Sequence, residues 1–202
     1  APVISGNVSL YNETRGEAIY PTPVIGALGL MDDVTRNAPI AFGEEGDLVL
    51  LLGATTSGGA PESLAGSEYL ETVHGLVAGQ PRIDMEMEIA VQRACRRAVA
   101  GGLVSSAHVC SDGGLAVAVA ESCIAGEIGF SGSLDGSGRW DAALFGEEQS
   151  RIVISVPAAN RKAVEGICAE EGALVALLGE VGGEALVIAG LLDVPVSQIA
   201  DA

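Results

Sequence analysis

The chain has 202 residues and a formal net charge of −17, from 27 acidic and 10 basic side chains. It is 49% hydrophobic, with 28 glycines and few aromatic residues, which favours an α/β protein of one or two domains packed through small side chains. This charge repels phosphate backbones and anionic lipid, so we expect no nucleic acid and no membrane as partners. Any phosphate chemistry would need metal ions or another chain to neutralise charge.

The cysteines indicate the compartment. They are widely spaced in apolar runs, with no CxxC pair and no nearby histidine cluster, which is typical of reduced thiols in a protein core. We therefore expect a cytoplasmic protein. The chain starts in the middle of a strand-like run, so we also expect it to be cut from a longer polypeptide. The cysteines are Cys95, Cys110, Cys123 and Cys168.

Apolar and polar residues alternate over residues 3–11, which predicts a strand. Asn7 and Ser9 would project from one side of it, roughly 7 Å apart. An asparagine carbonyl suits Mg²⁺, a serine hydroxyl can bond a substrate, and Gly6 would let a nucleotide approach bare backbone. On spacing alone, a strand with a solvent-facing polar side is the stronger interpretation.

The next segments complete a first predicted domain. A turn at residues 14–16 suits a hairpin, and residues 22–31 and 47–53 read as strands, the second of them buried. Residues 55–61 are rich in Ser, Thr and Gly and look like a connection between two units. We therefore place a domain boundary between residues 54 and 55.

The second predicted domain is organised around an apolar helix. A helix starts at Asp84 and ends at Gly101, and residues 106–110 form a strand. A turn then leads into a nearly all-apolar helix over residues 115–123, whose small side chains let neighbours pack closely. Ser111 or Asp112 would cap its start, and Gly126 would end it in a left-handed cap.

The remaining elements suggest the architecture. Residues 128–130 and 151–156 read as strands, and a helix follows Pro157 and ends at Gly172. Residues 174–181 and 185–188 look like a closing hairpin, before a terminal helix from Pro195. This order predicts a two-layer α/β sandwich from about residue 55 onward.

Several runs together closely resemble the phosphoribosylformylglycinamidine synthase family, and the resemblance covers most of the chain. It looks like the C-terminal part of that family. The first run is very specific, whereas the Asp-Gly-Gly-Leu helix is shared with relatives such as aminoimidazole ribonucleotide synthetase. The runs are residues 5–14, 21–26, 29–33, 105–108, 111–118 and 144–151.

The resemblance implies both a fold and a set of roles. Residues 1–54 would be the end of a PurM-like, β-rich ATP-binding-type domain, and residues 55–202 the α/β C-terminal domain of the synthetase superfamily. Carried over onto the matching motif, Gly6 would contact ATP, Asn7 would bind a Mg²⁺ that bridges the phosphates, and Ser9 would contact the substrate. The family's other metal ligands, nucleotide lysine and catalytic histidine have no counterpart here, so we expect this chain alone to be inactive.

The family reaction is also implied by the resemblance. The enzyme phosphorylates the amide oxygen of formylglycinamide ribonucleotide with ATP, and ammonia from glutamine displaces the phosphate to give the amidine, with ADP, phosphate and glutamate as products. The implied partners are this substrate, the rest of the same chain, a PurQ-like glutaminase and a small PurS-like subunit.

His108 could suggest a general base, but the resemblance argues for a structural role. In this family the catalytic histidine lies in the N-terminal half, and the residue after His108 is Val109 where the family commonly has Asp. Asp112 is accordingly expected to cap its helix.

Two alternatives remain open at this point. One is another ATP-dependent member of the superfamily, such as aminoimidazole ribonucleotide synthetase or a selenide- or hydrogenase-maturation kinase, which the run over residues 7–13 speaks against. The other is a non-catalytic assembly or ligand-binding module. We also expect residues 1–53 to leave strand edges without partners, so that the chain self-associates.

Overall fold

A computed structural model describes residues 2–53, 60–134 and 138–201. The chain divides into two compact units, Ala1–Val34 and Thr35–Ala202, which we call the first and second units. The first unit contains the short strands β1 (Glu13–Thr14) and β2 (Glu17–Ala18). The strands of the second unit are β3 (Leu48–Gly53), β4 (Ser106–Val109), β5 (Phe130–Gly132), β6 (Arg151–Val156), β7 (Val175–Val181), β8 (Ala185–Ile188) and β9 (Leu192–Pro195). Its helices are η1 (Pro61–Leu64), α1 (Glu68–His74), α2 (Met85–Ala100), α3 (Gly114–Gly126), α4 (Trp140–Phe145), η2 (Ala158–Asn160), α5 (Arg161–Glu171) and α6 (Val196–Ala200).

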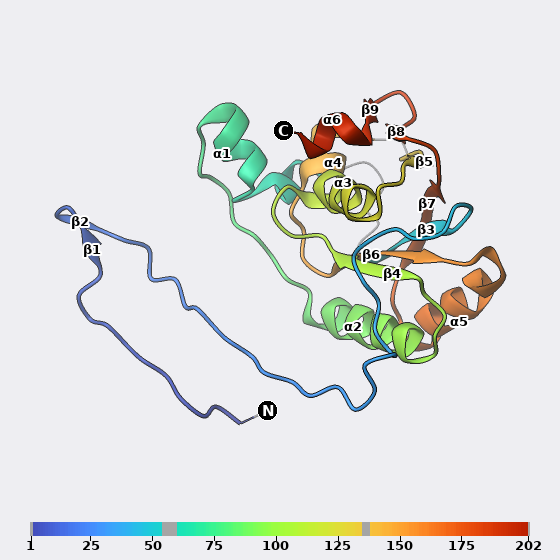
Figure 1. The fold of residues 1–202 in the computed structure, drawn as a ribbon. Coiled ribbons are helices and arrows are strands. Elements are labelled where there is room, and N and C mark those ends of the chain that lie inside the picture. Colours follow the sequence, from blue (N-terminus) through green and yellow to red (C-terminus); the bar gives the residue numbers. More distant parts are fainter. Residues whose placement is uncertain (1, 54–59, 135–137, 202) are drawn as a thin grey trace. The chain divides into compact units, whose positions relative to one another are not determined.

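The first unit is a small hairpin with extended arms (Figure 1). Strands β1 and β2 pair antiparallel, and Arg15 and Gly16 between them both have positive φ, as a tight hairpin turn requires. The hairpin predicted from residues 14–16 is confirmed. The strands predicted at residues 3–11 and 22–31 are wrong, because these residues are exposed and no strand is assigned to them. A strand needs a neighbour for its backbone groups, and the alternating pattern by itself supplies none.

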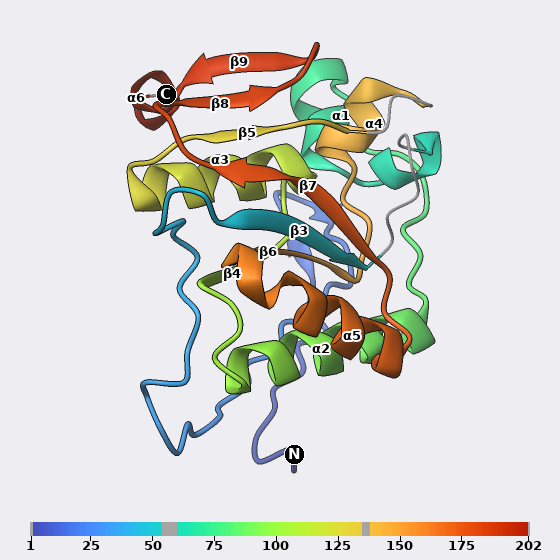
Figure 2. The same ribbon diagram turned by 90° about the vertical axis from the view of Figure 1, so that its right-hand side faces the viewer.

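The second unit is built on one seven-stranded sheet, ordered β4-β6-β3-β7-β5-β8-β9. All neighbouring pairs are antiparallel except β5 and β8, which run parallel. Helices α2 and α5 lie on one face, and α3, α4 and α6 lie on the other (Figures 1 and 2). The predicted α/β class is confirmed, and the sheet has two covered faces, which makes three layers where the sequence suggested two.

The central strand β3 explains why both faces are covered. Its run of five apolar residues alternates between two separate cores. Val49 and Leu51 belong to the core around α3, and Leu50 and Leu52 belong to the core around α2 and α5. A strand that is apolar on both faces must be buried on both faces.

Helix α3 contacts β4 and β6 near one end of the sheet and β8 near the other, so it extends across most of the sheet's width. The helix itself is confirmed, but both predicted caps are wrong. The N-cap is Gly113, at φ 77°, and no side chain caps the helix, so neither Ser111 nor Asp112 does so. At the other end Gly126 is the last helical residue, and Glu127 takes the left-handed conformation at φ 52°.

Close packing explains the glycine at position 126. A Cβ there would lie 1.9 Å from the backbone oxygen of Phe42. The backbone amide of Phe42 in turn donates to the oxygen of Ser122 at 3.0 Å. Gly126 therefore serves a helix-to-backbone contact, and it does not provide the cap.

The predicted closing hairpin is also wrong. Strands β7 and β8 do not pair with each other, because β5 lies between them. The entry to β5 passes beside the link between them, where Gly129 donates to the oxygen of Gly183 and Gly182 donates to the oxygen of Gly129, each at 2.8 Å. The glycines that suggested a tight turn instead allow these two backbone segments to approach each other closely.

The expected domain boundary between residues 54 and 55 falls directly after β3. In the structure β3 lies in the middle of the sheet, between β6 and β7, and the compact units divide between Val34 and Thr35. Phe42 is also 1% exposed within the core of the second unit.

Among the described helices, none combines the length and the apolar character needed to cross a membrane.

Candidate functional site

The residues to which the sequence assigned a site lie in the first unit. Gly6, Asn7 and Ser9 are all exposed, on an extended segment before β1. The backbone oxygen of Ser9 accepts a hydrogen bond from Nδ2 of Asn12 at 2.7 Å, which turns the chain toward the hairpin. The side chains of Asn7 and Ser9 are therefore accessible to a ligand.

Gly6 is not required by the packing of this chain. A Cβ at this position would meet nothing within 4 Å, and its φ lies outside the range that favours glycine. Neither crowding nor backbone conformation explains the missing side chain. Close approach by a ligand backbone or phosphate would explain it.

The donor set for a metal ion is incomplete in this chain. Asn7 offers one neutral, hard oxygen of the type that Mg²⁺ accepts. In the described part of the chain no group of three or more His, Cys, Asp or Glu side chains is arranged to hold a metal. Asn7 fits as one ligand of a Mg²⁺ site whose remaining ligands would come from outside these residues.

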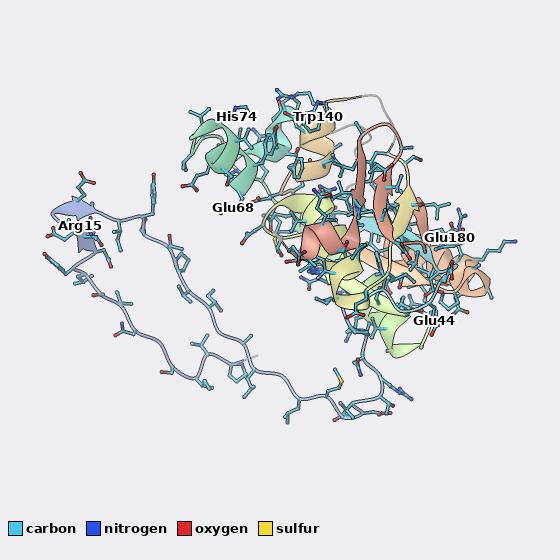
Figure 3. The ribbon with its side chains drawn as sticks, turned by 45° about the horizontal axis from the view of Figure 1, so that its top comes forward. Arg15, Glu44, Glu68, His74, Trp140 and Glu180 are labelled. Atoms are coloured by element: carbon cyan, nitrogen blue, oxygen red, sulfur yellow. The ribbon has the colours of Figure 1, made fainter. Side chains whose placement is uncertain are left out.

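In the second unit, the run over residues 144–151 contributes a carboxylate clamp. Glu147 Oε1 accepts from the backbone amide of Gly113 at 2.8 Å and from that of Glu68 at 2.9 Å. Gly113 is the N-cap of α3 and Glu68 is the first residue of α1, labelled in Figure 3. One carboxylate thus accepts from two backbone amides, one at the start of each helix, where negative charge is favourable.

Arg151, at the end of the same run, is a buried cation. It is 7% exposed, and Nη1 donates to the backbone oxygen of Gly146 at 3.1 Å. Its nearest carboxylate is that of Glu148, at 4.0 Å from Nη1, which is too long for a hydrogen bond. Within the described residues, Nε of Arg151 has no hydrogen-bond partner.

Two adjoining cavities surround the turn before α3. One has a volume of about 220 Å³ and is lined by Arg151, and the other has a volume of about 360 Å³ and is lined by Glu147. Cys110, Ser111 and Gln149 line both. From the sequence, residues 144–151 were predicted only to be a family motif. The arginine and glutamates within this short run are a signal that could have indicated a polar site.

The structural interpretation of His108 agrees with its contacts. Nε2 of His108 lies 2.7 Å from Oε2 of Glu121, which joins β4 to α3. His108 lines none of the cavities described here. Asp112 lies in the turn before α3 and lines the larger cavity, where it does not cap the helix.

All four cysteines are free thiols, as expected. Burial raises the pKa of Cys110 to about 11 and that of Cys123 to about 12. The nearby Arg151 guanidinium partly offsets the effect at Cys110. Such thiols are poor nucleophiles, so neither is a candidate for covalent catalysis.

Comparison with known sequences identifies the family. The model for "AIR synthase related protein, C-terminal domain" matches residues 44–190. Phosphoribosylformylglycinamidine synthase subunit PurL from Moorella thermoacetica is 48% identical over 93% of this chain and 25% of its own length. The same subunit from a Synechococcus strain is 51% identical over 91% of this chain and 24% of its own length. The chain spans about a quarter of the length of these relatives.

Comparison with solved structures supports the fold. A structure of Thermotoga maritima PurL complexed with FGAR has a TM-score of 0.69, with 17% sequence identity, over 83% of this chain and 30% of that one. The predicted resemblance to the phosphoribosylformylglycinamidine synthase family is confirmed. Because the family model covers well over half of its residues, the chain belongs to the AIR synthase related proteins, through their C-terminal domain.

Proposed function

We propose that this chain acts as part of a phosphoribosylformylglycinamidine synthase, the ligase that converts formylglycinamide ribonucleotide, glutamine and ATP to the amidine. The observation that carries the proposal is the identity of 44–51% to subunits named PurL over 91–100% of the chain. Nothing in the comparisons favours the alternative of an aminoimidazole ribonucleotide synthetase. Since the chain spans a quarter of those relatives, the activity belongs to a longer assembly.

In this proposal the first unit contributes three contacts. The bare backbone at Gly6 admits the nucleotide, the Asn7 side-chain oxygen holds Mg²⁺, and the Ser9 hydroxyl bonds the substrate. Their exposure and the empty space beside Gly6 support these roles. The metal, when bound, would neutralise phosphate charge that an acidic chain cannot neutralise by itself.

The proposed partners follow the same reasoning. Solved relatives are described as T. maritima PurL complexed with FGAR, as the same protein with ATP, and as PurLQS. For this chain we propose the same substrate and nucleotide, together with the rest of the polypeptide, a PurQ-like glutaminase and a PurS-like subunit. The free thiols agree with a reducing compartment, so the cytoplasm is the proposed location.

The test uses the full-length enzyme that contains this chain. We expect Asn7→Ala to reduce ATP turnover at least about a hundredfold, because loss of a transition-state contact worth about 3 kcal/mol has that effect. Ser9→Ala should instead raise KM for the substrate, since it costs about 1–3 kcal/mol of binding. Both variants should unfold like the wild type, because both positions are exposed.

Matched controls lie on α6, where Gln198 and Ser197 are also exposed. Gln198→Ala and Ser197→Ala should leave both kinetic constants unchanged. Full activity of Asn7→Ala at saturating Mg²⁺ would refute the metal role. Equal loss in the α6 controls would show that the assay reports general damage.

A further inference from the structure

The inference concerns the smaller of the two cavities before α3, which we call the Arg151 cleft. Its volume is about 220 Å³, below the roughly 300–1,000 Å³ typical of pockets for drug-sized ligands. Its polar lining comes from α2, from the turn before α3 and from the start of β6. These lining residues are Glu88, Gln92, Ser111, Gln149, Ser150 and Arg151.

The first step is the charge of Arg151. A guanidinium is always protonated, and a buried one needs an acceptor for each donor group. Arg151 is 7% exposed and has one hydrogen bond to a neutral carbonyl, while Nε is left without a partner in the described structure. Unpaired buried donors are rare in native proteins and call for an explanation. The Glu148 carboxylate, at 4.0 Å from Nη1, compensates the guanidinium charge only in part, and an anionic group in the cleft that Arg151 lines would compensate the rest.

The second step is the carboxylate of Glu88 in the lining of the same cleft. Its Oε2 accepts from the hydroxyl of Ser150 at 2.5 Å, and its Oε1 accepts from Nε2 of Gln92 at 2.5 Å. Ser150 makes this contact from a left-handed backbone at φ 64°, which costs a residue other than glycine free energy. The strained serine holds the carboxylate in the wall of the cleft.

The third step excludes simple ions. A phosphate would face Glu88 within the cleft and Asp112 and Glu147 in the adjoining cavity, and would be repelled by them. A simple cation would face the buried guanidinium. A molecule with one negative and one positive group can satisfy both charges of the cleft. Its negative group would bind Arg151 and Ser111, and its positive group would bind Glu88.

We propose that the Arg151 cleft binds a small zwitterion with the ammonium and carboxylate groups of a free α-amino acid. The carboxylate accepts from Arg151 and from the Ser111 hydroxyl, and the ammonium donates to Glu88. The adjoining cavity of about 360 Å³ shares Ser111 and Gln149 with the cleft, so it has room for a side chain. Every residue of this site belongs to the second unit, whereas the residues proposed for the ligase function belong to the first.

The binding test is calorimetric titration of this chain with glycine, alanine and glutamate. N-acetylglycine and glycinamide each retain one of the two charged groups, and inorganic phosphate and Mg-ATP test the other ligand classes. We expect at least one amino acid to bind at least about tenfold more tightly than either single-charge analogue, as loss of one charge-assisted hydrogen bond predicts. Absence of amino acid binding would overturn the proposal, as would equal or tighter binding of phosphate or Mg-ATP in the cleft.

The variant test assigns the binding to the cleft. Glu88→Gln keeps the shape and removes the charge, and should weaken amino acid binding by about tenfold. Glu86→Gln is the matched control, because Glu86 lies on the same helix and is exposed. Unchanged affinity in Glu88→Gln, or an equal loss in Glu86→Gln, would overturn the assignment.

Arg151→Met separates binding from structure. It removes the buried charge at similar length, so it should abolish binding while the melting temperature of the ligand-free chain stays the same or rises. If Arg151 served only the structure, the Arg151→Met variant would have a lower melting temperature, and its folded fraction would still bind the amino acid. Circular dichroism before each titration establishes whether the variant is folded. If Arg151→Met does not fold, Glu88→Gln still tests the proposal.

Discussion

Glu147 shows how much one side chain can organise in the second unit. Its Oε1 accepts from the amide of Glu68, the first residue of α1, at 2.9 Å and from that of Gly113, the N-cap residue of α3, at 2.8 Å. We expect Glu147→Ala to lower the free energy of unfolding by about 1–3 kcal/mol, because the partly buried amide of Gly113 and the exposed amide of Glu68 both lose a charged acceptor. Glu147→Gln keeps an oxygen acceptor and should lose less. Urea denaturation of both variants measures the difference, and equal losses would show that the clamp contributes nothing specific.

Buried thiols give a second prediction for single residues. The pKa of Cys110 is raised to about 11 and that of Cys123 to about 12 by burial, from 9.0. At pH 8 these thiols should react with a disulfide reagent about a hundredfold more slowly in the folded chain than in urea, because the thiolate reacts. A pKa that is raised on folding stabilises the chain below pH 9, and that stability is lost as pH rises toward 11–12. Reaction at the urea rate would show that the thiols are accessible and unshifted.

At the scale of elements, two helical glycines should respond in opposite ways to alanine. Gly126→Ala would place a Cβ 1.9 Å from the oxygen of Phe42, so α3 must move and stability should fall by about 1–3 kcal/mol or more. Gly166 lies in α5 with nothing within 4 Å of a Cβ, so Gly166→Ala should raise stability by about 0.5–1 kcal/mol. Thermal unfolding of both variants is the measurement. A similar shift in both would contradict the packing argument.

Local signals in the sequence predicted the elements whose ends are set by neighbouring residues. Helix α2 starts where Asp84 accepts from the amides of Glu86 and Met87, and α5 ends at Gly172 with φ 80°. The failures came from contacts between distant residues. The N-cap predicted for α3 is wrong because the N-cap residue is Gly113, whose amide donates to the carboxylate of Glu147, 34 residues further along the chain.

The candidate site was predictable only in part, for the same reason. The motif around Asn7 was recognisable from consecutive residues, because the family motif is itself consecutive. The Arg151 cleft was not, since it joins Glu88, Ser111 and Arg151 from three separate elements. Likewise no pattern within β7 or β8 could reveal that β5 enters between them.

At the scale of the whole molecule, the two units should differ in resistance to proteolysis. Arg15 is exposed at the tip of the hairpin, labelled in Figure 3, whereas Arg151 is 7% exposed at the start of β6. Under native conditions trypsin should cut after Arg15 well before it cuts after Arg151, because cleavage of a buried site requires unfolding. Mass spectrometry of timed samples gives the order of cuts. Simultaneous cleavage would show that the second unit opens as readily as the first.

The position of β3 also determines when the molecule can fold during synthesis. This central strand ends at residue 53, but its partners are Arg151–Val156 and Val175–Val181, roughly a hundred residues later. A ribosome that adds about 5–20 residues each second therefore leaves an apolar strand unpaired for several seconds. Pairing over such distances is slow because a long loop must close first. Nascent chains that stall before β6 should thus be preferred substrates for chaperones, because neither partner strand of β3 has been synthesised by then.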